Sequence, residues 1–242
     1  MTLATPPAPR VLRLSELPKE LQWKLDPWTP IRDGLVWTQD PKDKFEPFKR
    51  MPPKPHFVPF IRDFQGGKDR MLIHKSRQMM MSWLFVYLLY HDAAQHTGRL
   101  NVFQSEEFSK SNELLDRAQL IHEMMDPAFW GGAKPAFTRT RTKPAKLIFP
   151  ELDSALMALP EGKNQLRQYA VSGVLMDEAA FWKDLLGTYG SSIPAATEAL
   201  DSVNNEDLGV QRGGRVIVLS SGIQNTDFHR MCLDREEMAH GE

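Results

Sequence analysis

Short runs of apolar residues alternate with longer segments of helical periodicity from about residue 71 to residue 220. The pattern predicts strands at 71–74 and 99–104, within 171–182 and at 215–219, helices at 79–96, 105–125 and 192–203, and a β-hairpin that pairs 146–150 with 154–160. Near-continuous apolar strands that alternate with helices are typical of a parallel sheet covered on both faces. We therefore predict an α/β fold with a mainly parallel central sheet, helices on both faces and an exposed loop at 204–214.

The first 55 residues have a different pattern, with many prolines, several aromatic residues and scattered charge. Proline has no N–H group and clashes with the preceding helical turn, so we do not expect "PFKRMPPKPHFVPF" (47–60) to form a regular helix. We predict an irregular N-terminal arm over 1–55 that packs its aromatic side chains on a body at 56–242. A short helix is expected within "LSELPKELQWKL" (14–25).

Composition narrows the classes of protein. The 242 residues, of which 41% are hydrophobic, fit one large domain with a small appendage. With a net charge of −1, the chain as a whole has no positive electrostatic field that would attract nucleic acid, so nucleic-acid binding would need a local patch of basic residues. The single cysteine, Cys232, excludes an internal disulfide framework and cannot build a structural zinc site. The seven histidines show no spacing typical of zinc ligands. Without a signal peptide or an apolar run of 18 residues, we expect an intracellular protein with no membrane partner.

A charged segment separates the expected strand at 71–74 from the expected helix at 79–96. Ligands of parallel α/β sheets bind beyond the carboxyl ends of the strands, where this segment lies. A phosphate site there needs backbone N–H groups at a helix start, a cation and a hydroxyl for Mg²⁺. Lys75 can supply the cation, Ser82 the hydroxyl, and Arg77 a second, fork-shaped cation.

This segment agrees poorly with the P-loop pattern Gly-x-x-x-x-Gly-Lys-[Ser/Thr]. Only Ser82 matches, whereas Met80 stands at the second glycine and Met81 at the lysine. A side chain at Met80 restricts the turn, and a solvated surface loop remains an equal alternative. The predicted nucleotide-binding residues are Lys75, Ser76, Arg77, Gln78, Met79, Met80, Met81 and Ser82.

Two further strand ends carry polar groups. The apolar strand in "GVLMDEAAF" ends at Asp177 and Glu178, and buried paired carboxylates are costly unless they hold a cation or move protons. The alternative is an acidic helix start. The strand at 215–219 ends in Ser220 and Ser221, whose hydroxyls could sense a phosphate, although an ordinary strand exit looks the same.

Two weaker candidates concern a base and a nucleic acid. Phe57, Phe60 and Arg62 in "HFVPFIRDFQ" (56–65) are candidates for a pocket that binds the adenine base, with core packing as the alternative for either phenylalanine. "KPAFTRTRTKPAK" (134–146) contains five cations and no acid, so it can follow a phosphate backbone, or be a solvated loop and strand edge.

Three segments in this order, "HKSRQMMMSW", "LPEGKNQLRQYAVSGVLMDEAAFW" and "VIVLSSG", resemble the ATPase domain of the large terminase subunit of tailed bacteriophages. The resemblance implies a P-loop NTPase architecture of the ASCE/RecA-like type over 56–242, with ATP and Mg²⁺ as cofactors. Lys75 would be a displaced P-loop lysine, and Ser82 with Asp177 would hold Mg²⁺. Glu178 would be the catalytic glutamate, and Ser220 and Ser221 would belong to the coupling motif.

The same resemblance implies an arginine finger. Arg167 is the candidate, acting on the ATP of a neighbouring subunit, and Arg77 competes for this role in cis. It implies double-stranded DNA, a portal protein and a small terminase subunit as partners. It also implies a homo-oligomeric ring, with a monomer in isolation as the alternative, in the host cytoplasm at the procapsid portal.

The family also carries a C-terminal nuclease domain, which we do not expect in this chain because little sequence follows "VIVLSSG". We therefore expect ATP hydrolysis without DNA cleavage. Two alternatives remain open at this point: a nucleotide-binding assembly module without turnover, because the P-loop Gly-Lys pair is missing, and a helicase-like ATPase.

Overall fold

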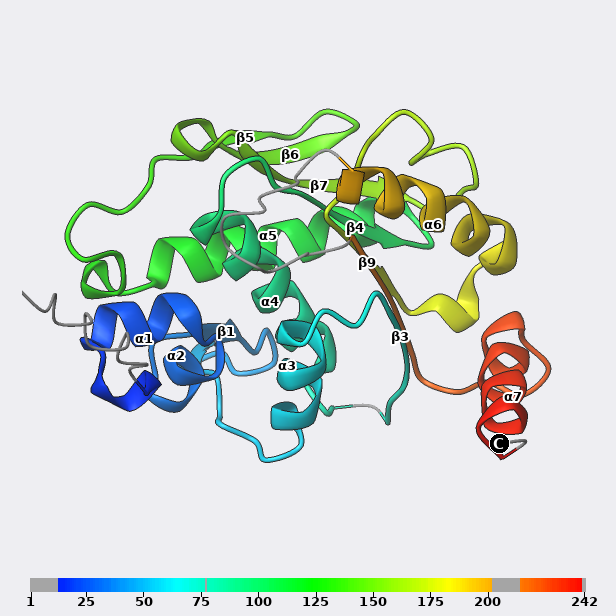
Figure 1. The fold of residues 1–242 in the computed structure, drawn as a ribbon, viewed down its shortest axis with the longest axis horizontal. Coiled ribbons are helices and arrows are strands. Elements are labelled where there is room, and N and C mark those ends of the chain that lie inside the picture. Colours follow the sequence, from blue (N-terminus) through cyan, green and yellow to red (C-terminus); the bar gives the residue numbers. More distant parts are fainter. Residues whose placement is uncertain (1–12, 77, 202–213, 241–242) are drawn as a thin grey trace, which may run out of the picture.

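A computed structural model describes residues 13–76, 78–201 and 214–240 and shows a seven-stranded sheet (Figure 1). The strand order is β3 (Arg70–His74), β9 (Arg215–Ser220), β8 (Gly173–Asp177), β4 (Leu100–Ser105), β7 (Ser154–Pro160), β6 (Ala145–Phe149) and β5 (Thr138–Thr140). The first five strands are parallel, β6 pairs antiparallel with β7, and β5 pairs antiparallel with β6. The mainly parallel sheet and the hairpin are confirmed, whereas β5 was not predicted.

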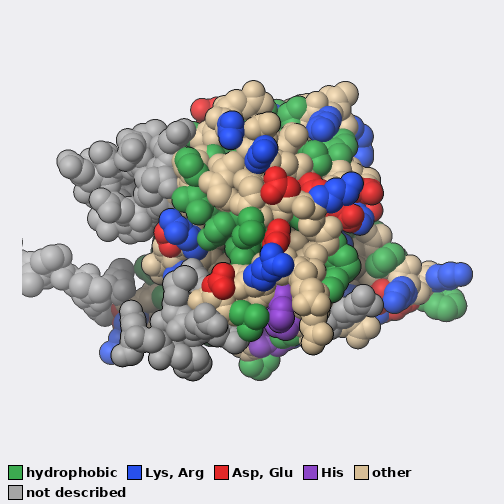
Figure 2. Space-filling view, turned by 90° about the vertical axis from the view of Figure 1, so that its right-hand side faces the viewer, with side chains coloured by type: hydrophobic (Ala, Val, Ile, Leu, Met, Phe, Trp, Pro, Cys, Tyr) green, Lys and Arg blue, Asp and Glu red, His purple; other side chains and the backbone are tan. Residues whose placement is uncertain are grey.

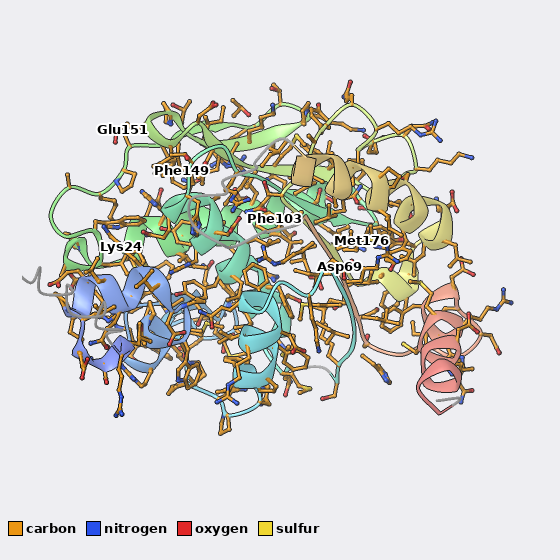
Figure 3. The ribbon with its side chains drawn as sticks, in the orientation of Figure 1. Lys24, Asp69, Phe103, Phe149, Glu151 and Met176 are labelled. Carbon is orange, nitrogen blue, oxygen red and sulfur yellow. The ribbon has the colours of Figure 1, made fainter. Side chains whose placement is uncertain are left out.

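Helices cover both faces of this sheet, as predicted. Alternate residues of each strand point to opposite faces, so Ile217 and Leu219 belong to one buried cluster and Val216 and Val218 to another. The first cluster contains residues of α3 (Phe57–Gln65), α4 (Met81–Gln95) and α5 (Phe108–Met124). The second contains residues of α6 (Leu185–Asp201) and the start of α7 (Asp227–His240). In Figure 3, Phe103 of β4 and Met176 of β8 lie in the interior between these layers.

Several helix boundaries differ from the predicted ones. Helix α4 begins at Met81 because Met80 has a left-handed backbone (φ 60°) that no helix can include. Helix α6 begins at Leu185 although Gly187, Gly190 and Pro194 hide its periodicity. Helix α7 was not predicted, and its sequence is mostly polar. The loop expected at 204–214 lies outside the described residues except for its last position.

The N-terminal segment is more regular than the predicted arm. It contains short helices and a two-stranded antiparallel sheet: η1 (Leu14–Glu16), α1 (Lys19–Leu25), α2 (Trp28–Arg32), β1 (Trp37–Gln39) and β2 (Phe48–Arg50). Ile31 and Val36 belong to the same buried cluster as α4, and Tyr87 Oη of α4 donates a hydrogen bond to the carbonyl of Pro27 at 3.0 Å. The stretch 47–60 is not one regular helix, as expected, although α3 begins within it at Phe57 and tolerates Pro59 in its first turn.

Short 3₁₀ helices complete the described elements, at η2 (Pro127–Trp130), η3 (Pro150–Leu152) and η4 (Ala179–Phe181). The described part of the chain has no helix with the length and apolar character needed to span a bilayer.

A buried histidine lies at the C-terminal end of α5. His122 is 1% exposed, its Nδ1 lies 3.0 Å from Tyr90 Oη, and the rings of Trp130, Phe137 and Phe149 pack around it. Burial, and then the positive charge of Lys134, lower the pKa of His122 to about 4. The imidazole is therefore neutral in the folded chain near neutral pH.

We expect this histidine to make the fold sensitive to acid. The unfolded chain binds a proton at this position below a pKa of about 6.5, whereas the folded chain does not until about 4, so stability is lost as pH falls through this window. The expected loss between pH 7.5 and pH 5 is about 2 kcal/mol in the free energy of unfolding by urea. His122→Gln should remove most of this dependence of the unfolding free energy on pH. An unchanged pH dependence in the variant would show that His122 is not its source.

Candidate functional site

Three predicted motifs meet at the carboxyl edge of the sheet. Strand β9 lies between β3 and β8, and the register places His74 beside Ser220 and Asp177 beside Leu219. The residues that follow the three strands therefore lie at one edge, and Lys75 N donates a hydrogen bond to the carbonyl of Ser220 at 2.9 Å. Figure 2 faces the right-hand side of Figure 1 and shows basic and acidic side chains close together on that face.

Lys75 and Glu178 form an ion pair across the end of β9. Lys75 Nζ lies 2.9 Å from Glu178 Oε1, although 103 residues separate the two in the sequence. The lysine side chain is 10% exposed and the glutamate side chain 40% exposed. Glu178 has a left-handed backbone (φ 53°), a strained conformation of a kind that is concentrated at functional sites. The sequence predicted both residues, and the structure brings them into contact.

Ser82 and Asp177 form a second contact beside the first. Ser82 Oγ, in the first turn of α4, donates a hydrogen bond to Asp177 Oδ1 at 2.9 Å. Burial raises the pKa of Asp177, and the positive charges of Lys75 and Arg117 and the Ser82 hydrogen bond oppose this rise. A carboxylate beside a hydroxyl supplies the oxygen ligands that Mg²⁺ prefers, so this pair fits a magnesium site.

The loop before α4 has a backbone conformation that its side chains disfavour. Gln78 (φ 68°) and Met80 (φ 60°) both lie in the left-handed region, so Met80 takes the backbone conformation that glycine adopts without cost. Left-handed residues next to right-handed ones direct backbone N–H groups into an anion-binding concavity. His56 Nε2 lies 3.2 Å from the Met79 carbonyl and ties this loop to the start of α3. Arg77 lies outside the described residues.

Strand β9 connects the acidic strand to the loop. Ser220 is fully buried, and its Oγ accepts a hydrogen bond from Ala180 N, two residues after Glu178, at 3.0 Å. Ser221 is half-buried. Gly222 lies so close to the His74 imidazole that a Cβ atom there would collide with it. A shift in β9 would therefore reach both sides of the site.

The residues expected to hold a base lie on α3. Phe57 is fully buried in the core, so core packing explains this residue. Phe60 is half-buried and packs edge-on against Phe85, with ring centroids 6.2 Å apart, while Arg62 is exposed. A base contact by Phe60 or Arg62 stays a prediction.

Arg167 lies in the segment between β7 and β8. Its side chain is exposed and makes no hydrogen bond or ion pair with another described residue, including Lys75 and Glu178. With Lys163 and small residues of α6 it lines a cavity of about 470 Å³. Its place at the surface suits a residue that acts on a second molecule.

The basic segment at 134–146 is only partly available to a ligand. Lys134 Nζ donates hydrogen bonds to the carbonyls of His122 and Glu123 at 2.8 and 3.0 Å, which caps the end of α5. The Arg139 side chain is 7% exposed and pairs with Asp116 at 2.7 Å. The other cations are Arg141, which is exposed and 3.8 Å from Asp116 Oδ1, Lys143, which is exposed, and Lys146, whose Nζ lies 5.9 Å from the Tyr169 ring.

Comparison with solved structures shows a shared fold. The large terminase of bacteriophage HK97 superposes with a TM-score of 0.62 at 14% identity, over 88% of this chain and 42% of that one, so the chain spans less than half of that protein. The predicted P-loop NTPase-like fold is thereby confirmed. Two structures of the large terminase ATPase domain of Thermus phage P74-26 match with TM-scores of 0.49 and 0.46, at 14% and 13% identity, over 73% and 67% of this chain and 69% and 63% of theirs. No protein-family model and no curated protein sequence matches the chain.

Proposed function

We propose that this chain is the ATPase domain of a viral DNA-packaging large terminase subunit, which couples ATP hydrolysis to translocation of double-stranded DNA. The observation that carries the proposal is the pair of contacts Lys75–Glu178 and Ser82–Asp177, at the strand ends on either side of β9. A cation, a hydroxyl and two carboxylates gathered near the start of α4 are the groups that a metal-bound triphosphate requires. The fold shared with the HK97 large terminase supports the same conclusion.

The residues divide the chemistry among them. Ser82 and Asp177 would hold Mg²⁺, which neutralises phosphate charge when bound. Lys75 would leave Glu178 and bind the β- and γ-phosphates, while N–H groups of the loop cradle them. Glu178, released from Lys75, would orient the attacking water and accept its proton. Ser220 would carry the change at Glu178 into β9.

A further cation is expected at the γ-phosphate when charge builds up in the transition state. Arg167 is exposed and makes no ion pair with another described residue, so we assign it to the triphosphate of a neighbouring copy in a ring. Arg77 remains the candidate in cis. A ring also sums weak DNA contacts over its subunits, so exposed Arg141 and Lys143 would suffice as phosphate contacts despite a net charge of −1. The other proposed partners are a portal protein and a small terminase subunit, in the host cytoplasm.

The direct test is Mg²⁺-dependent phosphate release by the purified chain, with and without linear double-stranded DNA. We expect hydrolysis that DNA stimulates and that Asp177→Asn lowers by about 100-fold or more, because the metal site loses its charge. Asp69→Asn, at an exposed position outside the site, is the matched control and should keep wild-type activity. Nucleotide binding without hydrolysis at any protein concentration would favour an assembly module instead, and strand separation would favour a helicase-like ATPase.

A further inference from the structure

A cavity of about 530 Å³ opens beside the first turn of α4. Helix α5 forms one wall of the cavity and the β1–β2 sheet another, and Trp83 of α4 lies between them. Of its lining residues, Trp83 and Arg117 carry the argument. Trp83 directly follows Ser82 in the first turn of α4, so it lies one residue along the helix from the Ser82–Asp177 contact.

Arg117 of α5 is held against Trp83. The guanidinium carbon lies 5.2 Å from the centroid of the indole ring, within the range of a cation–π contact. A planar guanidinium that rests on an aromatic face has fewer conformations to lose when it binds a ligand. Trp83 therefore fixes the cation relative to the turn of α4 that carries Ser82.

The hydrogen-bond donors of Arg117 are not used by the rest of the described chain. It forms no hydrogen bond or ion pair with another described residue, and the carboxylate of neighbouring Asp116 already binds Arg139 at 2.7 Å and Asn112 at 3.2 Å. Trp83, on which its guanidinium rests, directly follows Ser82. Arg117 is thus a half-buried cation with free donors beside the helix turn that carries Ser82.

From this geometry we infer that Arg117, braced by Trp83, is a positioning residue for the terminal phosphate of the bound nucleotide and acts in cis. The inference rests on the proposed function. Ser82 and Asp177 would hold Mg²⁺ beside the terminal phosphates, so a cation near Ser82 would meet the part of the ligand that ATP has and ADP lacks. Lys75 on the loop side and Arg117 on the α5 side would then bracket the triphosphate.

The test is the preference of the chain for triphosphate over diphosphate. Dissociation constants for a non-hydrolysable ATP analogue and for ADP, both with Mg²⁺, are measured by fluorescent-nucleotide competition. Arg117→Gln should lower the ratio of the ADP dissociation constant to the ATP-analogue dissociation constant about tenfold, which is the effect of one charge-assisted hydrogen bond. The ADP dissociation constant itself should stay within about twofold of the wild-type value. Arg117→Lys should restore part of the preference, and Trp83→Leu should lose part of it because the platform is gone.

Arg50→Gln is the matched control, since the exposed Arg50 guanidinium also lies over an indole ring, 3.8 Å from the Trp37 centroid, but does not line this cavity. It should keep the wild-type ratio. An unchanged ratio in Arg117→Gln, or an equal loss for both nucleotides, would overturn the inference and leave the proposed function standing. A wild-type chain that binds neither nucleotide would overturn both.

Discussion

Glu178→Gln is expected to abolish ATP hydrolysis and, at the same time, to tighten nucleotide binding. Removing a carboxylate that accepts a proton from water should lower turnover by about 10²- to 10⁴-fold. The same change removes the partner of Lys75, whose Nζ lies 2.9 Å from Glu178 Oε1. A half-exposed ion pair contributes up to about 1 kcal/mol, so freeing the lysine should tighten binding about two- to fivefold. Turnover is followed by phosphate release and affinity by fluorescent nucleotide without Mg²⁺.

The two measurements separate the role of Glu178 in catalysis from its role as the ion-pair partner of Lys75. Glu151→Gln is the control, because Glu151 is an exposed glutamate outside the site (Figure 3), and it should change neither quantity. Wild-type turnover in Glu178→Gln would remove this residue from the chemistry. Lost turnover with unchanged affinity would show that Lys75 reaches the phosphates without being released from Glu178.

Most of the sheet could be predicted because its strands are buried on both faces. Continuous apolar runs such as the one in β9 are typical of strands that have no face in contact with water, and the hairpin around Leu152 is bounded by turn residues. Helix α6 could be placed only in part, because glycines and Pro194 interrupt its pattern and tertiary packing overrides their low propensity. Strand β5 has three residues and α7 is mostly polar, so neither carries a clear apolar signal.

The site was predictable as a set of residue types but not as a set of contacts. Strand ends indicated Lys75, Asp177 and Glu178, because charge directly after a buried strand is unusual. The contact between Ser82 and Asp177 joins residues 95 apart in sequence, and only the strand order brings them together. Arg117 gave no signal, since an arginine on a polar helix is ordinary until the helix is placed beside Trp83.

The role proposed for Lys75 agrees with the burial of the loop residue that stands at the usual lysine position. Met81, at the usual lysine position, is 1% exposed and belongs to the buried cluster beneath α4. A lysine there would have to bury its ammonium group, which is costly without a partner. Lys75 instead leaves the end of β3 and reaches the rim of the sheet, where Glu178 is within hydrogen-bond distance. The position of the cation along the chain differs from the usual pattern, but its place at the strand end remains.

Lys75→Ala is therefore expected to remove nucleotide binding more completely than any other single change in the loop. The variant loses the cation for the β- and γ-phosphates, and charge-assisted hydrogen bonds of this kind contribute about 1.5–3 kcal/mol, or roughly 10- to 100-fold in affinity. Stability should change by less than about 1 kcal/mol, because Glu178 is 40% exposed and water can solvate it. Calorimetric titration with Mg²⁺ and a non-hydrolysable ATP analogue measures the first quantity and urea unfolding the second.

Lys68→Ala is the matched control, because Lys68 is an exposed lysine paired with Asp63 at 2.8 Å and lies before β3. Lys75→Arg keeps the charge in a bulkier group and should retain intermediate affinity. If Lys75→Ala binds nucleotide as the wild type does, the ion pair with Glu178 is structural and the cation must come from another residue. If the variant also unfolds at much lower urea, the 10%-exposed lysine stabilises the strand ends, and Lys75→Arg then decides whether charge or shape is required.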